Sequence, residues 1–222
     1  MKTKIVHRVS KENWKLKDRI LEKSRELFFK YGYTRLSMDE IASRLAISKA
    51  TLYRYFPDKK NLFQAVIKKT RTEIMTRLEA ISTDENLKVK EKLFTFFTFI
   101  SRFLSGVNRE LIRDMQRHLP EIWQEIKVFQ REKIFPIFSA LVKEGVAQGE
   151  IKSDLDARIF LEMFFYLAGE FINPDWVLEN DYSPSELISS IIRIVFYGIF
   201  TAEEPTKKDR SGSLRRAKKH GH

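Results

Sequence analysis

The sequence contains no cysteine, which excludes disulfide bridges and thiolate metal sites. This absence agrees with the reducing cytoplasm, where we expect the protein to be located. Glycine and proline are scarce, at 8 and 6 of 222 residues, and their scarcity favours long helices over a turn-rich β fold. The N-terminus lacks the apolar segment of a signal peptide, and no run approaches the roughly 20 apolar residues that span a bilayer.

Signatures of catalysis are also missing. The four histidines have no metal-ligand spacing such as H-E-x-x-H; they are His7, His118, His220 and His222. The sequence has no phosphate-binding loop, no GxGxxG and no nucleophile elbow. We therefore predict that the protein is not an enzyme and uses neither a metal nor a cofactor.

Positive charge is concentrated at the two ends of the chain. Residues 1–60 carry 16 Lys and Arg against 7 Asp and Glu, and residues 205–222 carry 7 against 1. The segment between them, 61–204, carries 18 against 22 and is slightly acidic. A basic N-terminal unit on an acidic body predicts a polyanion as the partner of that unit. The alternative is that the basic termini only aid solubility.

Residues 37–60, SMDEIASRLAISKATLYRYFPDKK, have the pattern of two short helices followed by the start of a third. Ser37 and Glu40 have the spacing of a capping box before the first helix. Ser48 and Asp58 are the caps expected for the second and third helices. The second helix carries polar, aromatic and basic residues beside its apolar positions. Two such helices with a tight turn between them are a helix-turn-helix candidate.

The apolar periodicity of the whole chain predicts an all-α fold of about nine helices. A first helix over 15–31 ends at Gly32 and follows a loose basic arm over 1–13. Together with the two helices of the motif, it makes a three-helix unit. A helix over 58–81 follows without a flexible linker, so we expect it to be shared with the rest of the chain as a rigid connector.

The second half of the chain is predicted to be a bundle of longer helices. They span 87–105, 108–118, 121–148, 154–172 and 183–200. The first of them contains LFTFFTFI, whose phenylalanines, Phe94 included, point around nearly the whole circumference, so we expect burial on all sides. Pro136 lies inside the long third one and should kink or divide it.

The two C-terminal helices carry more apolar residues than one core-facing side requires. A central place in the bundle would explain this, but a helix next to the C-terminus is poorly placed for the centre. We therefore favour a dimer interface. Its predicted residues are Phe160, Phe164, Ile188, Ile191, Ile192, Val195, Phe196 and Ile199.

The segment GYTRLSMDEIASRLAISKATLYRYFPDKKNLF (32–63) resembles the helix-turn-helix of the TetR/AcrR transcriptional regulators. The resemblance extends from Ile20 to Val66, and the rest of the chain agrees only in the number, length and order of its helices. Ala46 stands where the turn glycine of the family is usual, and Ala50 where a second glycine is common. A non-glycine residue in a left-handed turn costs on the order of 1 kcal/mol, which is tolerable.

The resemblance assigns the DNA interface to the second helix of the motif and to phosphate contacts around it. The residues so assigned are Thr34, Ser37, Ser48, Lys49, Ala50, Thr51, Tyr53, Arg54, Tyr55, Lys59 and Lys60. Arg54 is the best candidate to read a guanine, because its fork matches O6 and N7 of that base. For Tyr53 and Tyr55, core packing is the alternative to contacts with phosphates or bases.

The resemblance further implies a homodimer, held through the last two helices, whose basic units bind successive major grooves of a palindromic operator. A ligand in the larger domain would tilt the connector helix and release the DNA, most often from a repressor. The alternative is a helical DNA-binding activator without an inducer pocket. A protein that binds membrane surfaces through its basic ends is a more distant rival.

Aromatic residues of the second half can line a pocket for an apolar or amphipathic effector. The candidates are Phe97, Phe103, Met115, Trp123, Phe164 and Tyr166, with His118 and Arg113 placed to orient an anionic head group. Ordinary core packing is the alternative for each residue of the pocket. For His118 and Arg113 the alternative is a solvated surface position.

The domain boundaries follow from these patterns. Residues 1–60 make the helix-turn-helix domain, and 61–204 make the ligand-binding and dimerisation domain. Residues 205–222 are predicted to be a disordered basic tail, because they combine many charges with no apolar period. The tail can add electrostatic affinity for DNA, be passive, or be partly a remnant of an added segment.

Overall fold

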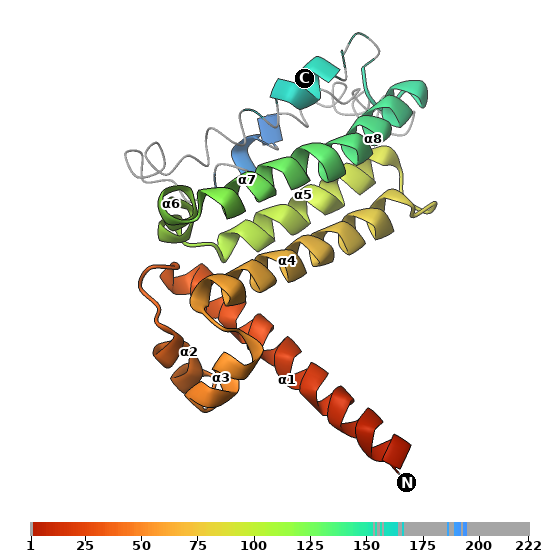
Figure 1. Cartoon of the computed structure of the whole chain (residues 1–222). Helices are drawn as coiled ribbons and strands as arrows, with labels where there is room; N and C mark the ends of the chain where they lie inside the picture. Colours follow the sequence, from red (N-terminus) through yellow and green to blue (C-terminus); the bar gives the residue numbers. More distant parts are fainter. Residues whose placement is uncertain are drawn as a thin grey trace, which may run out of the picture.

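The computed structural model describes residues 2–152, 154, 156, 158–163, 166, 186, 189–191, 193 and 194. Its elements are α1 (Lys2–Tyr31), α2 (Met38–Arg44), α3 (Lys49–Tyr55), α4 (Lys59–Ser82), α5 (Val89–Ser105), α6 (Arg109–His118), α7 (Pro120–Phe129), the π-helical turn η1 (Gln130–Ile134) and α8 (Phe135–Ala147). In Figure 1, α1 to α3 form one end of the molecule, and α4, α5, α7 and α8 are stacked at the other.

Local hydrogen bonds begin α2, α3 and α4 at the residues that the sequence predicts. Ser37 Oγ accepts from Glu40 N at 3.2 Å, and the Glu40 carboxylate accepts from Ser37 N at 2.8 Å, which completes the capping box of α2. Ser48 caps α3 and Asp58 caps α4 by accepting from the backbone N–H three residues on, at 3.0 and 2.7 Å. The starts of these three helices are therefore set by short-range contacts.

The tight turn between α2 and α3 passes through Ala46, whose φ is +54°. This left-handed conformation is the one expected at the position where glycine is usual, and it is uncommon for alanine because of its Cβ. Gly32, with φ +84°, ends α1, and Gly149, with φ +75°, follows α8. Gly32 ends its helix as the sequence predicts, and Gly149 has the same left-handed conformation after α8.

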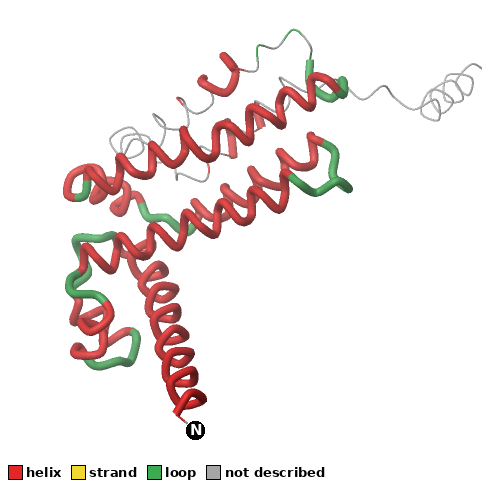
Figure 2. The backbone as a smooth tube through the Cα atoms, turned by 45° about the vertical axis from the view of Figure 1, so that its right-hand side comes forward, coloured by secondary structure: helices red, strands yellow, loops and turns green. Residues whose placement is uncertain are grey.

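The N-terminus differs from the prediction. Helix α1 begins at Lys2, so the loose arm over 1–13 and a helix start near Lys15 were wrong. The segment 2–13 contains neither glycine nor proline, so a helix nucleated in the later part of α1 can extend through it to Lys2. Figure 2 shows the resulting long α1 running away from the stack, with α2 and α3 alongside it.

The long segment predicted over 121–148 is divided, as expected for a helix that contains Pro136. It consists of α7, the π-helical turn η1 and α8, and Pro136 is the second residue of α8. A proline lacks the N–H for an i to i−4 bond, and a π-turn is one way for a helix to absorb that loss. For α5 the expectation of burial on all sides was wrong, since Phe94 is 60% exposed.

Two hydrophobic cores meet along α4. The first packs α1, α2 and α3 against the beginning of α4, and it also includes α6 and the start of α7, where Leu111 and Ile122 are buried. The second lies between the later part of α4, α5 and α8, around Leu93 and Phe138. Helix α4 contributes to both cores, and α6 belongs to the core of the helix-turn-helix although it lies far beyond residue 60.

The predicted dimer surface falls mostly outside the described residues. Those that the structure does not describe are Phe164, Ile188, Ile192, Val195, Phe196, Ile199 and the tail over 205–222. Of the remainder, Ile191 is buried in the second core and Phe160 packs partly against it. The interface through the last two helices therefore stays a prediction.

Replacing Ala46 by glycine should stabilise the protein by about 0.5–1 kcal/mol, because glycine adopts φ near +54° without steric cost. Ala50→Gly is the matched control. Ala50 lies within α3, where glycine should destabilise by about 0.5–1 kcal/mol. Chemical denaturation measures both changes, and a loss of stability in Ala46→Gly would contradict the account of the turn.

Candidate functional site

Helix α3 presents a continuous exposed face. Its buried side is formed by Leu52, with Phe56 at its C-cap. The exposed residues follow at helical spacing on the opposite side and are Lys49, Ala50, Tyr53 and Arg54. Such a face, polar and basic and backed by a packed core, has the size and chemistry to enter the major groove of DNA.

The side chains on and beside this face have different freedom to act. Lys49 is paired with Asp39 of α2. The Arg54 guanidinium lies 5.3 Å from the Tyr55 ring, and no described carboxylate pairs with it. The Tyr55 hydroxyl donates to Asn13 of α1, while Tyr53 is 47% exposed. Arg54 and Tyr53 are therefore the members of the face most available to a partner.

The hydroxyl groups of Ser37 and Ser48 are helix caps, and Thr51 shares the Ser48 cap through a contact of 2.8 Å between the two hydroxyls. Both serines therefore lie at helix N-termini, those of α2 and α3. At such a position the free backbone N–H groups and the helix dipole favour an anion. Thr34 is different, because its hydroxyl and its backbone N–H are both held by Asp114 of α6.

The two lysines that begin α4 also have different roles. Lys59 donates to the carbonyl oxygens of Tyr33 and Leu36 at 3.1 and 2.8 Å, so its ammonium secures the loop before α2. Burial lowers the pKa of Lys59. Lys60 is exposed and forms a salt bridge of 2.6 Å with Glu121, which raises the pKa of Lys60 and lowers that of Glu121.

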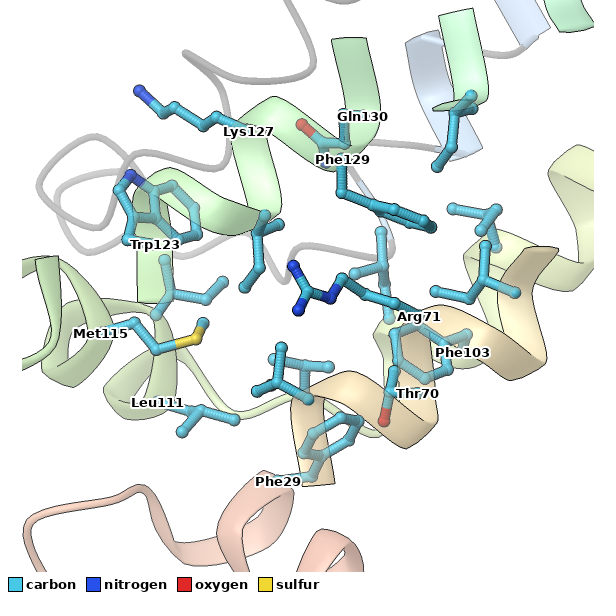
Figure 3. Close-up of a pocket in the computed structure, with 18 of the residues that line it drawn as sticks. Phe29, Thr70, Arg71, Phe103, Leu111, Met115, Trp123, Lys127, Phe129 and Gln130 are labelled. Atoms are coloured by element: carbon cyan, nitrogen blue, oxygen red, sulfur yellow. The ribbon is translucent and has the colours of Figure 1, made fainter. Parts of the chain in front are cut away.

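An apolar pocket of about 220 Å³ lies where the two cores meet. It receives side chains from α1, α4, α5, α6, α7, η1 and α8, as Figure 3 shows in part. Of the residues predicted to line it, Phe97, Phe103, Met115 and Trp123 do so. His118 is exposed and Tyr166 is 68% exposed, and neither lines the pocket; Phe164 lies outside the described residues.

Arg71 is a cation at the wall of this apolar space. Its side chain extends from α4 toward α7 (Figure 3), where it donates to the Glu125 carboxylate at 3.0 Å and to the Glu125 carbonyl oxygen at 3.3 Å. Its guanidinium also lies 5.9 Å from the Phe129 ring. A charge beside apolar surface is costly unless it is paired, and Glu125 supplies the pairing.

Two further polar groups reach the same pocket. The Thr70 hydroxyl is buried and has no hydrogen-bond partner among the described residues. Lys127 lies 5.7 Å from the Trp123 ring, at the side formed by α7. In the sequence, Thr70, Arg71 and Lys127 resemble other polar residues on a helix surface, and their place at the pocket becomes visible only when α4 and α7 are brought together.

The helix-turn-helix matches a known family. Residues 20–66 match the bacterial regulatory proteins of the tetR family. The chain is a TetR-family transcriptional regulator. The match covers α2 and α3, the packed end of α1 and the beginning of α4, which is the part that carries the exposed face described above.

Relatives of this TetR-family regulator extend over most of the chain. The uncharacterized HTH-type transcriptional regulator YvaF of Bacillus subtilis is 26% identical over 186 residues, or 84% of this chain and 96% of its own. FadR from Bacillus subtilis, solved in complex with stearoyl-CoA, is 25% identical, with a TM-score of 0.58 over 82% of this chain and 98% of its own. A TetR-family regulator from Agrobacterium tumefaciens has a TM-score of 0.66 at 18% identity over 85% of this chain and 100% of its own, which supports the fold alone.

These matches confirm the all-helical fold with an N-terminal helix-turn-helix. Membership in a family of transcription regulators also agrees with the prediction that the chain is not an enzyme. Within the described residues, no helix is long and apolar enough to cross a membrane. The DNA-binding role of the helix-turn-helix follows from the family.

The position of Lys59 in this regulator leads to a test. Lys59→Met keeps the aliphatic stem but removes the bonds to the carbonyl oxygens of Tyr33 and Leu36, so it should destabilise the protein by about 1 kcal/mol. Lys60→Met is the control, because it removes only an exposed ion pair with Glu121 and should leave stability near that of the wild type. Urea denaturation compares the two, and equal midpoints would refute a structural role for Lys59.

Proposed function

We propose that this regulator binds a palindromic operator in the cytoplasm as a homodimer and represses transcription until a small amphipathic effector releases it. The exposed face of α3 supports the DNA-reading part of the proposal, and the apolar pocket with Arg71 at its wall supports the effector part. The pocket favours this function over an activator without an inducer site.

Operator recognition rests on the side chains that α3 leaves free. Arg54 reads a guanine through its paired donors, and the methyl groups of Ala50 and Thr51 contact thymine methyls. Lys60, Ser37, Ser48 and the N-termini of α2 and α3 contact phosphates, which position the helix without reading sequence. Two copies of α3, about 34–36 Å apart in a homodimer, fit successive major grooves. Thr34 and Lys59 act indirectly, since both hold the loop before α2.

Arg54→Ala should weaken binding to the operator by about 10- to 100-fold, the value of one bidentate contact with guanine, and relax the preference at one base pair of each half-site. Fluorescence anisotropy with operator and scrambled duplexes at one salt concentration measures both effects. Arg131→Ala is the matched control, because it removes an exposed arginine from the body of the protein, and it should change operator binding little. Equal losses of Arg54→Ala on operator and scrambled DNA would exclude base reading by Arg54.

The size and charge of the pocket limit the kind of effector it can hold. A volume of about 220 Å³ is smaller than the roughly 300 Å³ at which sites for whole drug-sized ligands begin. It suits the apolar part of a longer molecule, such as a segment of an acyl chain, whose polar part then lies at the wall. The resemblance to FadR, which was solved with stearoyl-CoA, supports an acyl group joined to an anionic head.

Arg71 is the residue best placed to select such a head group. Its guanidinium donates to the carboxylate and to the backbone carbonyl oxygen of Glu125, an exposed residue of α7, and a ligand anion can replace the carboxylate as acceptor. An apolar molecule without a charge cannot make this exchange. The proposed effector is therefore amphipathic and anionic, with its chain among the phenylalanines of α5 and its head near Arg71.

Stearoyl-CoA is the probe for this proposal. Isothermal titration should show binding to the wild-type protein and an affinity about tenfold lower for Arg71→Gln, which loses the charge but keeps hydrogen-bonding capacity. Arg131→Gln should bind as the wild type does. Unchanged affinity in Arg71→Gln would show that the head group lies elsewhere, and absence of binding to the wild type would remove acyl-CoA thioesters of this length from the proposed effector class.

A further inference from the structure

Asp114 of α6 is a buried carboxylate that holds the loop between α1 and α2. Asp114 is only 5% exposed. Asp114 Oδ2 accepts from Tyr33 N at 2.7 Å and from Thr34 N at 2.8 Å, and the Thr34 hydroxyl lies 3.0 Å from both carboxylate oxygens. All of these donors belong to the loop that leads into Ser37, the cap of α2.

A second contact joins the same two segments at the other end of α6. Asn108, the N-cap of α6, donates from its backbone N–H to Phe29 O at 2.7 Å and from Nδ2 to Lys30 O at 2.9 Å. These carbonyl groups lie in the last turn of α1, where helical partners are lacking. Helix α6 therefore supplies donors to the end of α1 and an acceptor to the loop that follows it.

The fit between the loop and α6 is close. A Cβ added at Gly32 would lie 3.0 Å from Asp114 Oδ2 and 3.4 Å from Glu110 Cβ, so the backbone of the loop lies directly against the helix. Hydrogen bonds to a charged acceptor depend strongly on distance and angle. A displacement of α6 by about 1 Å relative to the loop would break the bonds from Tyr33 and Thr34.

A neighbouring side of α6 forms a wall of the apolar pocket. Leu111, Ile112 and Met115 line it, and Asp114 is adjacent to Met115 and one helical turn from Leu111. The helix thus carries pocket residues and the carboxylate that holds the loop within fewer than two turns. An occupant that pushes on the pocket face of α6 acts on the Asp114 contacts through one rigid element.

We propose that Asp114 is a positioning residue that links the pocket, through α6, to the DNA-reading unit formed by α2 and α3. With the Asp114 bonds formed, the loop holds α2 and α3 in the orientation that reads DNA. Occupancy of the pocket shifts α6, separates Asp114 from Tyr33 and Thr34, and frees the loop. This link rests on the proposed function, and it acts in addition to any tilt of α4.

A substitution that fills the pocket tests the link without an effector or DNA. Ile100→Trp places an indole in the pocket from α5, at a residue that packs against the second core and not against the core of the helix-turn-helix. In hydrogen exchange, the amides of Tyr33 and Thr34 should exchange at least fivefold faster than in the wild type. Val128→Trp is the control, since Val128 is 41% exposed and does not line the pocket, and it should leave these amides unchanged. Unchanged exchange in a folded Ile100→Trp protein would overturn the proposal.

Operator affinity then distinguishes coupling through Asp114 from two independent losses of DNA binding. Asp114→Asn and Ile100→Trp should each weaken operator binding about tenfold, and the double variant should lose no more than the larger single loss, because both act through the same contact. Losses that multiply, or wild-type affinity in a folded Asp114→Asn protein, would overturn the proposal. Failure of the wild type to bind any palindromic DNA would instead refute the proposed function, while the exchange experiment would still decide the link.

Discussion

The carboxylate of Asp114 and the loop over 32–37 depend on each other. A buried carboxylate is tolerated only when its lone pairs are satisfied, and the loop supplies two backbone N–H groups and a hydroxyl. Each charge-assisted bond contributes roughly 1.5–3 kcal/mol, and a buried partner left unpaired costs a comparable amount. Lys59 secures the same loop from α4 by binding two of its carbonyl oxygens. The entry to the DNA-reading unit is thus fixed from both sides by single charged groups.

The pocket lies beside the helices that hold this loop. It is bordered by α6 and α4, the two helices that carry Asp114 and Lys59, and by Phe29 near the end of α1. The walls of the pocket therefore include the helices that hold α2 and α3 in place. A ligand can shift the population of a regulator only through a difference in affinity between two conformations. In the proposed mechanism the Asp114 contacts distinguish the two conformations, and the effector prefers the one in which they are broken.

The parts of the fold that could be predicted from the sequence are those with short-range causes. Ser37, Ser48 and Asp58 signal helix starts because each bonds to the backbone three residues on. Asp114 carries no comparable signal, since an aspartate within a polar helix is ordinarily solvated. Its role depends on partners 80 and 81 residues away. Arg71 was missed for the same reason, and the helical N-terminus was missed because a run of charges resembles a loose arm.

The separation between Asp114 Oδ2 and Tyr33 N tests the central claim most directly, and it can be measured in two structures of the full chain. It is 2.7 Å here. In a complex with operator DNA we expect it to stay within hydrogen-bonding range. In a complex with stearoyl-CoA we expect it to exceed about 3.5 Å, together with a shift of α6. The same short distance in both complexes, with the two copies of α3 nevertheless moved apart, would contradict transmission through Asp114.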